Sequence, residues 1–203
     1  MPILSNFFLL KRFTYLNLIK LQASLENNIL HYVIMLKLEF PNESHKDQYL
    51  EMIKEWKNYE KPTSPWRLFS GDTYEDFLRI VTKDLTDNEY GVNSTLFFLV
   101  EDTGPDILGA IQVRYHINHP KLIETWGHIG YGIRPSARRK GYAMKMLELT
   151  LKEAKKLWID RILITCDDDN IASAKVIEAN GGILEKYMQR DWVKSRRYWI
   201  HLL

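Results

Sequence analysis

Hydrophobic and polar residues follow two different periods along this chain. Apolar residues recur at helical spacing in four segments, which predicts four amphipathic helices. These helices span residues 45–59, 72–85, 141–157 and 170–179. Short apolar or β-branched runs bounded by turn residues predict seven strands. The strands span residues 36–40, 95–101, 107–117, 124–133, 161–166, 183–187 and 197–202.

The predicted element order, β-α-α-β-β-β-α-β-α-β-β, indicates the fold class. Hairpin strands that lead into a strand–helix–strand unit favour an α/β protein, with a mixed sheet and helices on both of its faces. The crossover through helix 141–157 predicts that strands 124–133 and 161–166 are parallel neighbours. At the helix ends, Ser44 is the predicted N-cap of the first helix, and Gly181-Gly182 closes the last one.

The first 34 residues differ from the rest of the chain. Their apolar runs are too short and too interrupted by charges for a membrane span, and the features of a secretory signal are missing. We expect residues 1–34 to be an N-terminal extension outside the domain, with Met35 as the natural start and residues 35–203 as the domain. An amphipathic surface helix is the competing interpretation of the extension.

Charge and cysteine content narrow the function classes. The formal net charge is +2, and both signs are spread along the chain, so we expect no nucleic-acid partner. The single cysteine, Cys166, excludes a disulfide framework within the chain and a multi-cysteine metal site. We therefore expect a cytoplasmic protein with no bound metal and no membrane partner.

The most informative segment runs from Gly130 to Ala143 and reads GYGIRPSARRKGYA. It joins a predicted strand, a basic turn and the start of a predicted helix. The first helical turn has unpaired N–H groups and the positive end of the helix dipole, so it attracts anions. Gly141 lets a ligand approach the backbone closely, and Arg138, Arg139 and Lys140 add positive charge. The segment predicts a pyrophosphate-binding turn, and its glycine spacing is neither a dinucleotide fingerprint nor a P-loop.

Residues Arg138 to Ala143 resemble the Arg/Gln-x-x-Gly-x-Gly/Ala motif of the GNAT acetyltransferases. The resemblance covers residues 35–203 in element order and is sharpest from Gly127 to Gly182. Together with Arg197-Tyr198-Trp199-Ile200, these segments are similar to a largely uncharacterised bacterial subgroup of predicted acetyltransferases. The resemblance implies a GNAT-like acyl-CoA N-acyltransferase fold, with acetyl-CoA as co-substrate and no metal.

The resemblance also implies the cofactor contacts. In this family the motif backbone holds the CoA pyrophosphate, and pantetheine inserts as an extra strand where the two strands flanking the motif helix splay apart. The Tyr131 N–H would polarise the acetyl carbonyl. Asn170 would contact the pantetheine arm, or simply cap its helix. The implied cofactor-binding residues are Tyr131, Ile133, Arg138, Arg139, Lys140, Gly141, Tyr142, Ala143, Asn170 and Ser173.

The chemistry that the resemblance implies is direct attack of a primary amine on the acetyl thioester in a ternary complex. An amine of pKa about 10.4 must first lose a proton, and Glu124 and His128 are the candidate bases. Strand alternation places His128 on the face of the strand opposite Tyr131. The alternative interpretation of His128 is a structural histidine, and that of Glu124 is a solvated carboxylate at the end of a strand. The family's proton-donating tyrosine corresponds to Ile177 here, so Tyr142, Tyr187 and water remain open as the acid.

The acceptor is less well defined by the sequence. We expect its site in the region 45–85 and in the loops near 116–122 and 188–195, where acidic groups beside aromatic rings would suit a cationic amine. These residues are Trp56, Trp66, Tyr74, Glu75, Asp76 and Trp192. The acceptor is either a small molecule or a peptide, and a homodimer through the C-terminal strands is left open. The alternative function is a non-catalytic acyl-CoA-binding regulatory module.

Overall fold

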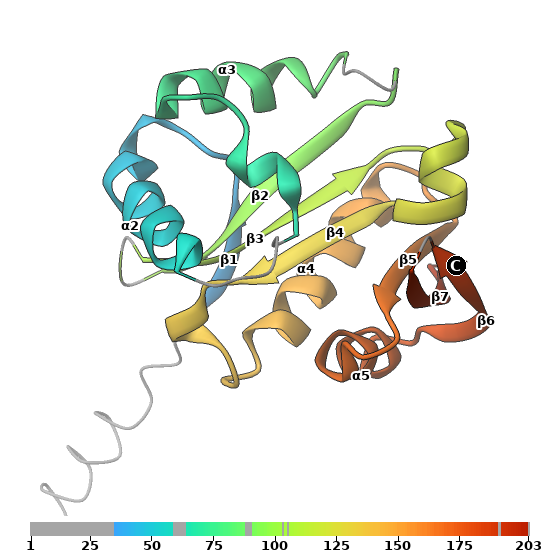
Figure 1. Cartoon of the computed structure of the whole chain (residues 1–203). Coiled ribbons are helices and arrows are strands. Elements are labelled where there is room, and N and C mark those ends of the chain that lie inside the picture. Colours follow the sequence, from blue (N-terminus) through green and yellow to red (C-terminus); the bar gives the residue numbers. More distant parts are fainter. Residues whose placement is uncertain are drawn as a thin grey trace, which may run out of the picture. The chain divides into compact units, whose positions relative to one another are not determined.

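The computed structural model describes residues 35–58, 64–87, 91–102, 104, 106–190 and 192–202. The predicted extension, residues 1–34, lies outside the described residues. The helices are α2 (Lys46–Lys57), α3 (Tyr74–Lys83), α4 (Tyr142–Lys156) and α5 (Ile171–Ala179) (Figure 1). The strands are β1 (Leu36–Glu39), β2 (Ser94–Glu101), β3 (Ile107–Arg114), β4 (Ile129–Ile133), β5 (Arg161–Asp167), β6 (Ile183–Arg190) and β7 (Val193–His201). The predicted order of helices and strands is confirmed.

The strands form two sheets, one in the order β1-β2-β3-β4 and one in the order β5-β7-β6. All neighbours within these sheets are antiparallel. The expected parallel ladder between β4 and β5 is not formed by the described strands. The two strands meet only where β4 begins: His128 N donates to Leu163 O (2.8 Å), and Leu163 N donates to His128 Nδ1 (2.9 Å). β5 then pairs with β7, so none of the described strands pairs with the β4 edge beyond this junction.

The start of β4 corrects the prediction of a strand from Glu124 onward. Residues Leu122–Trp126 form a π-helical turn, η3, and β4 begins only after Gly127. Gly127 has a φ of 65°, and a Cβ there would lie 2.4 Å from Leu163 O. Only glycine fits this close approach between the two sheets, so the chain turns at Gly127 before it can extend.

The first long helix also begins differently from the prediction. A 3₁₀ turn, η1 (Glu43–His45), precedes α2, and Asn42 rather than Ser44 is the N-cap of this turn. The Asn42 side chain accepts from Ser44 N, and His45 Nδ1 accepts from Asn42 N, which completes a capping box. Ser44 lies two positions after Asn42, inside the turn, and donates its backbone N–H to the Asn42 side chain.

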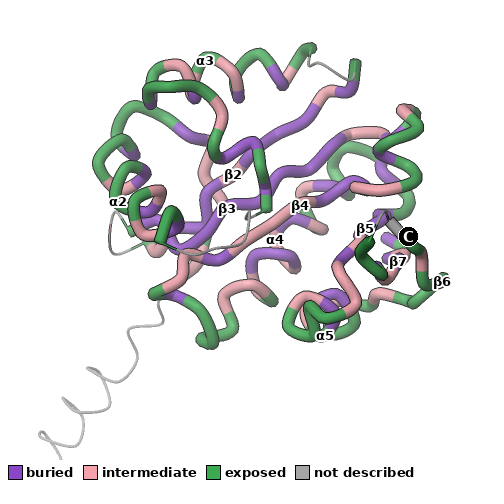
Figure 2. The backbone as a smooth tube through the Cα atoms, viewed as in Figure 1, coloured by how far each residue is buried: buried purple, intermediate pink, exposed green. Residues whose placement is uncertain are grey.

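Two hydrophobic clusters cover the opposite faces of the four-stranded sheet. Alternate β2 residues Leu96, Phe98 and Val100 pack with α2 and α3, whereas Leu99 packs on the α4 side. β3 is buried along its whole length, as the purple central strands of Figure 2 show. Helices therefore lie on both faces, as predicted, and the strand order leaves β4 at one edge of this sheet.

Candidate active site

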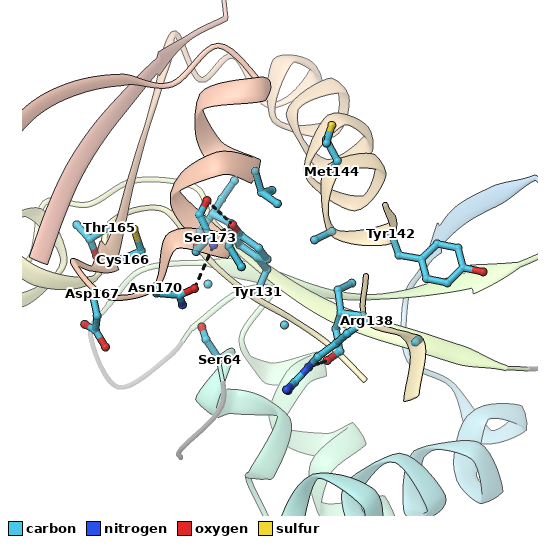
Figure 3. A pocket seen from close by; sticks show the side chains of 18 of the residues that line it. Ser64, Tyr131, Arg138, Tyr142, Met144, Thr165, Cys166, Asp167, Asn170 and Ser173 are labelled. Carbon is cyan, nitrogen blue, oxygen red and sulfur yellow. Dashed lines mark hydrogen bonds between the residues drawn. The ribbon is translucent and has the colours of Figure 1, made fainter. Parts of the chain in front are cut away.

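A cavity of about 870 Å³ opens where β4 and β5 separate. Its walls come from β4, the turn before α4, the end of β5 and the first turns of α5 (Figure 3). The predicted cofactor-binding residues that line it are Tyr131, Ile133, Arg138, Arg139, Gly141, Tyr142, Ala143, Asn170 and Ser173. Lys140 is not among its lining residues. The cavity thus gathers segments more than 40 residues apart in sequence.

The free edge of β4 directs backbone groups toward this cavity. Arg114 N donates to His128 O, and Arg134 N donates to Leu108 O, so the even-numbered residues of β4 face β3. Backbone groups alternate sides along a strand, and Tyr131 and Ile133 therefore point their N–H and C=O groups away from β3. Arg138 Nε donates to the Ile133 carbonyl (3.1 Å), which leaves the two N–H groups as the donors on this edge.

The turn before α4 has the geometry of an anion-binding loop. Arg139 and Gly141 both have positive φ, 61° and 82°, and α4 has no side-chain cap. The first N–H groups of a helix have no intrahelical acceptor, so the start of α4 offers donors and the positive end of its dipole. A Cβ on Gly141 would meet nothing within 4 Å, so the backbone borders open space there.

A carboxylate from α2 holds this turn in place. Glu55 accepts from Arg134 Nε (2.5 Å) and from the backbone N and hydroxyl of Ser136. Ser136 lies in the 3₁₀ turn η4 (Pro135–Ala137). These bonds join residues that are 79 and 81 positions apart in the sequence, and no local pattern predicts them. These bonds fix the path of the chain between β4 and the turn before α4.

The Tyr131 side chain crosses the space between the two sheets. Its hydroxyl lies 2.8 Å from Ser173 Oγ on α5 (Figure 3). Burial raises the pKa of Tyr131 to about 12, so the phenol keeps its proton at neutral pH. Asn170 caps α5 by accepting from Ser173 N (3.0 Å), and it also lines the cavity, so the two interpretations of Asn170 are compatible.

The two candidate bases lie outside the cavity lining. Glu124 is exposed in η3. His128 is buried, and its Nδ1 accepts from Leu163 N, a structural role at the junction of the two sheets. Burial, and then the charge of Arg114, lower the pKa of His128 to about 4. The imidazole is therefore neutral and engaged at physiological pH.

The tyrosines considered as proton donors have other partners. The Tyr142 hydroxyl donates to Glu101 Oε1 (3.0 Å), and its ring points away from the labelled side chains in Figure 3. Tyr187 is half exposed on β6, with Lys194 Nζ 4.2 Å from its ring centroid. Ile177 is fully buried in the core. Cys166 lines the cavity, and burial raises the pKa of its thiol to about 11, as expected of a protonated core thiol.

The other side of β4 is formed by its two glycines. A Cβ on Gly130 would lie 2.7 Å from Ser64 Oγ, and one on Gly132 would lie 2.2 Å from Ser64 O. Trp56, Trp66, Arg114 and Trp126 line the cavity together with Ser64. From the sequence, Trp56 and Trp66 are expected as acceptor-side residues, but no sequence signal indicates Ser64 or Arg114. Ser64 lies in the loop before α3, and Arg114 is the last residue of β3.

The acidic residues expected near the acceptor do not line this cavity. Glu75 pairs with Lys46 (2.6 Å), Asp76 pairs with Arg79 (2.6 Å), and both pairs lie at the surface. The Tyr74 hydroxyl donates to Asn42 O, and Trp192 is 97% exposed.

Within the described part of the chain, no group of three or more His, Cys, Asp or Glu residues is placed to hold a metal. None of the described helices combines the length and apolarity that a membrane crossing requires.

Comparison with known proteins identifies the class. A family model described as "Acetyltransferase (GNAT) domain" matches residues 36–183. This match spans well over half of the chain, so the protein belongs to the GNAT acetyltransferases, which are acetyl-CoA-dependent N-acetyltransferases. The fold class and the resemblance inferred from the motif are confirmed. No curated protein sequence matches the chain.

Solved structures show the same fold at low sequence identity. The ribosomal-protein α-N-acetyltransferase RimL in complex with coenzyme A has a TM-score of 0.60 and 20% identity, over 82% of this chain and 93% of that one. The microcin self-immunity acetyltransferase MccE in complex with acetyl-CoA and AMP has a TM-score of 0.59 and 18% identity, over 82% and 92%. The spermidine/spermine N-acetyltransferase SpeG of Vibrio cholerae has a TM-score of 0.59 and 16% identity, over 82% and 94%.

Proposed function

We propose that this protein transfers the acetyl group of acetyl-CoA to a primary amine by direct attack in a ternary complex. The observation that supports this most is that the free edge of β4 and the uncapped start of α4 border one cavity of about 870 Å³. A strand edge suits an extended amide-bearing chain, and a helix start suits a pyrophosphate. RimL and SpeG, whose fold is similar, are named as acetyltransferases of protein and polyamine amines.

The proposed cofactor contacts follow the cavity wall. The backbone from Arg139 to Ala143 would hold the pyrophosphate, with the Arg138 and Arg139 side chains as supplementary donors. The N–H groups of Tyr131 and Ile133 would pair with the pantetheine arm, and Asn170 and Ser173 would face it from α5. Lys140, which does not line the cavity, would contribute charge alone.

The proposed reaction uses Tyr131 twice. The amine nitrogen bonds to the acetyl carbon while the bond from that carbon to sulfur breaks. The Tyr131 N–H would stabilise the negative charge on the carbonyl oxygen. The Tyr131 hydroxyl, held by Ser173, would protonate the leaving sulfur and recover its proton from solvent. Because Glu124 and His128 lie outside the lining, we infer that the amine gives up its proton to water.

The phosphate-binding turn is tested by calorimetric titration of acetyl-CoA into wild type and Gly141→Asp. The new carboxylate would repel the pyrophosphate, and we expect binding to weaken by at least roughly 100-fold. Gly181→Asp is a matched control, because Gly181 also has a positive φ (86°), also borders open space and lies outside the cavity lining. The control is expected to bind acetyl-CoA as wild type does.

The outcomes separate the candidate functions. Equal loss of binding in both variants would trace the effect to backbone strain and contradict the phosphate-binding turn. No binding to wild type would remove the functional part of the proposal and leave the fold. Binding without turnover over a broad amine panel would favour the non-catalytic acyl-CoA-binding module, for which the replacement of the family tyrosine by Ile177 is the motivating observation.

A further inference from the structure

One side of the cavity is walled by tryptophan side chains. Trp56, Trp66 and Trp126 line it together with Ser64. These residues come from α2, from the 3₁₀ turn η2 (Trp66–Phe69) and the residues just before it, and from η3. The proposed cofactor contacts lie elsewhere on the wall, along the β4 edge, the turn before α4 and the start of α5. The tryptophan side of the cavity is therefore the side available to the acceptor.

The indole of Trp66 is held from one face and is still exposed. Arg67 Cζ lies 4.6 Å from the centroid of the Trp66 ring, a cation–π contact. Arg67 is itself buried and forms an ion pair with Asp84 (2.7 Å), so the guanidinium under the ring is fixed. Trp66 is nevertheless 44% exposed. An aromatic ring has two faces, so a second ring has the face away from Arg67 on which to stack.

The indole of Trp126 is brought to the cavity by the π-helical turn η3. Thr165 Oγ1 donates to Thr125 O (2.6 Å), and the Arg197 guanidinium donates to Ile123 O. Both bonds tie η3 to the second sheet, so the position of Trp126 is set by β5 and β7 as well as by its own turn. Single π-helical turns are rare and are frequent at functional sites.

The Ser64 segment closes this part of the cavity toward β4. A Cβ on Gly130 would lie 2.7 Å from Ser64 Oγ, and one on Gly132 would lie 3.2 Å from Trp56 Cζ2. The two glycines thus make room for the segment that presents Trp66 two residues later. Trp56 is only 2% exposed, whereas Trp66 is largely open, so the apolar wall extends from the interior of the cavity to its mouth.

Charge on the cavity wall does not select a polycation. Among the described lining residues, three are cationic and two are anionic: Arg114, Arg138, Arg139, Asp167 and Asp169. A polyamine therefore finds no excess of negative charge there. An amine with a single charge and a large apolar group gains instead from the surface that it buries against the indoles.

We propose that the acceptor is an arylalkylamine, a primary amine joined to an aromatic ring by a short alkyl spacer, and that its ring stacks on Trp66 with Trp126 as the second wall. This inference rests on the proposed function. Aromatic pairs in offset-stacked or edge-to-face geometry are worth more than their buried area alone. A ring held at the mouth directs the amine inward, to the acetyl carbonyl at the Tyr131 N–H.

The test compares amines of matched size. 2-Phenylethylamine is paired with 2-cyclohexylethylamine, which has a saturated ring; ethylamine has no ring, and spermidine represents polycations. Turnover of acetyl-CoA is followed by the release of free thiol. We expect kcat/KM for 2-phenylethylamine to exceed that for ethylamine by roughly 10- to 100-fold, from burial of the ring. It should exceed that for 2-cyclohexylethylamine by roughly 2- to 10-fold, from stacking.

Variants assign the preference for an aromatic ring to the indoles. Trp66→Leu keeps an apolar side chain without a ring, and the ratio of phenyl to cyclohexyl substrate is expected to fall close to one. Trp66→Phe retains a ring and should keep the ratio above one. Trp158→Leu is the matched control, because Trp158 is 92% exposed and lies outside the cavity lining. Circular dichroism and acetyl-CoA titration show whether each variant is folded. Should Trp66→Leu fail to fold, Trp126→Leu is expected to lower the ratio.

Three results would overturn the inference. One is equal or better turnover of 2-cyclohexylethylamine or spermidine than of 2-phenylethylamine, which would leave the proposed function intact. Another is a preference for the aromatic ring that survives unchanged in Trp66→Leu or, if that variant is unfolded, in Trp126→Leu. The third is no turnover of any of these amines; the titration of acetyl-CoA into Gly141→Asp then decides separately whether the proposed cofactor site stands.

Discussion

Tyr131 shows how much one residue contributes at this site. Its backbone is directed to the open edge of β4, and its side chain reaches α5, where the hydroxyl meets Ser173. Burial raises its pKa to about 12, so the hydroxyl stays protonated over the whole working range of pH. The protonated phenol can therefore donate a hydrogen bond to the sulfur as negative charge develops on it, although the raised pKa makes full proton transfer less favourable than from an ordinary tyrosine.

Removing this hydroxyl separates chemistry from binding. We expect Tyr131→Phe to lower kcat by roughly 100-fold, a typical effect for loss of a general acid. The KM for acetyl-CoA should change little, since the backbone N–H is retained. Tyr187→Phe removes a hydroxyl outside the cavity lining and is the control. Steady-state kinetics on both variants check this, and an unchanged kcat in Tyr131→Phe would remove the proposed acid.

His128 is expected to affect stability through pH. Its ordinary pKa of 6.5 applies in the unfolded chain, and the folded value is about 4. Between these two pH values the unfolded chain binds the proton more readily than the folded protein does. The contribution of neutral His128 to the free energy of unfolding is therefore fully present above about pH 6.5, and it is lost as the pH falls toward 4. The loss amounts to about 3 kcal/mol in all.

Urea unfolding at pH 7.5 and pH 5 measures this contribution. His128→Asn keeps an acceptor for Leu163 N but does not titrate, so its stability should change less between the two pH values. An identical pH dependence in wild type and variant would show that the imidazole is not the titrating group.

At the scale of elements, β4 is shaped differently on its two sides. Ile129 and Ile133 bury their side chains in the core, whereas Gly130 and Gly132 admit the Ser64 segment from the other face. In the structure the two glycines allow close approach of the loop before α3. Neither has a positive φ, so their role is spatial rather than conformational.

The two glycines are expected to differ in their tolerance of a methyl group. Gly132→Ala would place Cβ 2.2 Å from a backbone oxygen, Ser64 O, and should cost about 1–3 kcal/mol of stability. Gly130→Ala meets Ser64 Oγ at 2.7 Å, a side-chain atom that can rotate away, and should cost less. Thermal unfolding of both variants gives the comparison, and the reverse order would contradict this account of the loop.

Local pattern was sufficient for the elements and for the motif, but not for contacts across the fold. Periodicity located the helices to within a few residues, and the glycine at position 141 marked the start of α4. Where a distant segment intervenes, the prediction was wrong, as at η3, which ends at Gly127 against Leu163. Arg114 and Ser64 reach the cavity through long-range packing, and nothing in their neighbouring residues signals it.

At the scale of the whole molecule, residues 35–203 form one compact unit. This unit makes contacts from its first residue, since Met35 O accepts from Asp102 N (2.9 Å) and β1 pairs with β2 immediately afterwards. Leu36 and Leu38 pack against the core on the α4 side. These contacts support the proposal that the acetyltransferase domain begins at Met35.

Two truncations test this boundary. A chain that begins at Met35 should keep the melting temperature and acetyl-CoA affinity of the full-length protein. A chain that begins at Pro41 also loses β1 and should melt at a lower temperature, because an edge of the sheet and two core leucines are removed. Differential scanning calorimetry measures both, and a marked loss of stability in the first truncation would place the boundary earlier.

The distribution of tryptophans has a practical consequence for such experiments. Three of the six, Trp56, Trp66 and Trp126, line the cavity, while Trp158 and Trp192 are more than nine-tenths exposed. Intrinsic fluorescence should therefore report occupancy without any label. Emission from Trp66 and Trp126, which are partly exposed, should shift as ligand replaces solvent around them, whereas that of the two surface indoles stays constant and is removed by acrylamide quenching. The protein thus carries its own spectroscopic sensor of substrate binding.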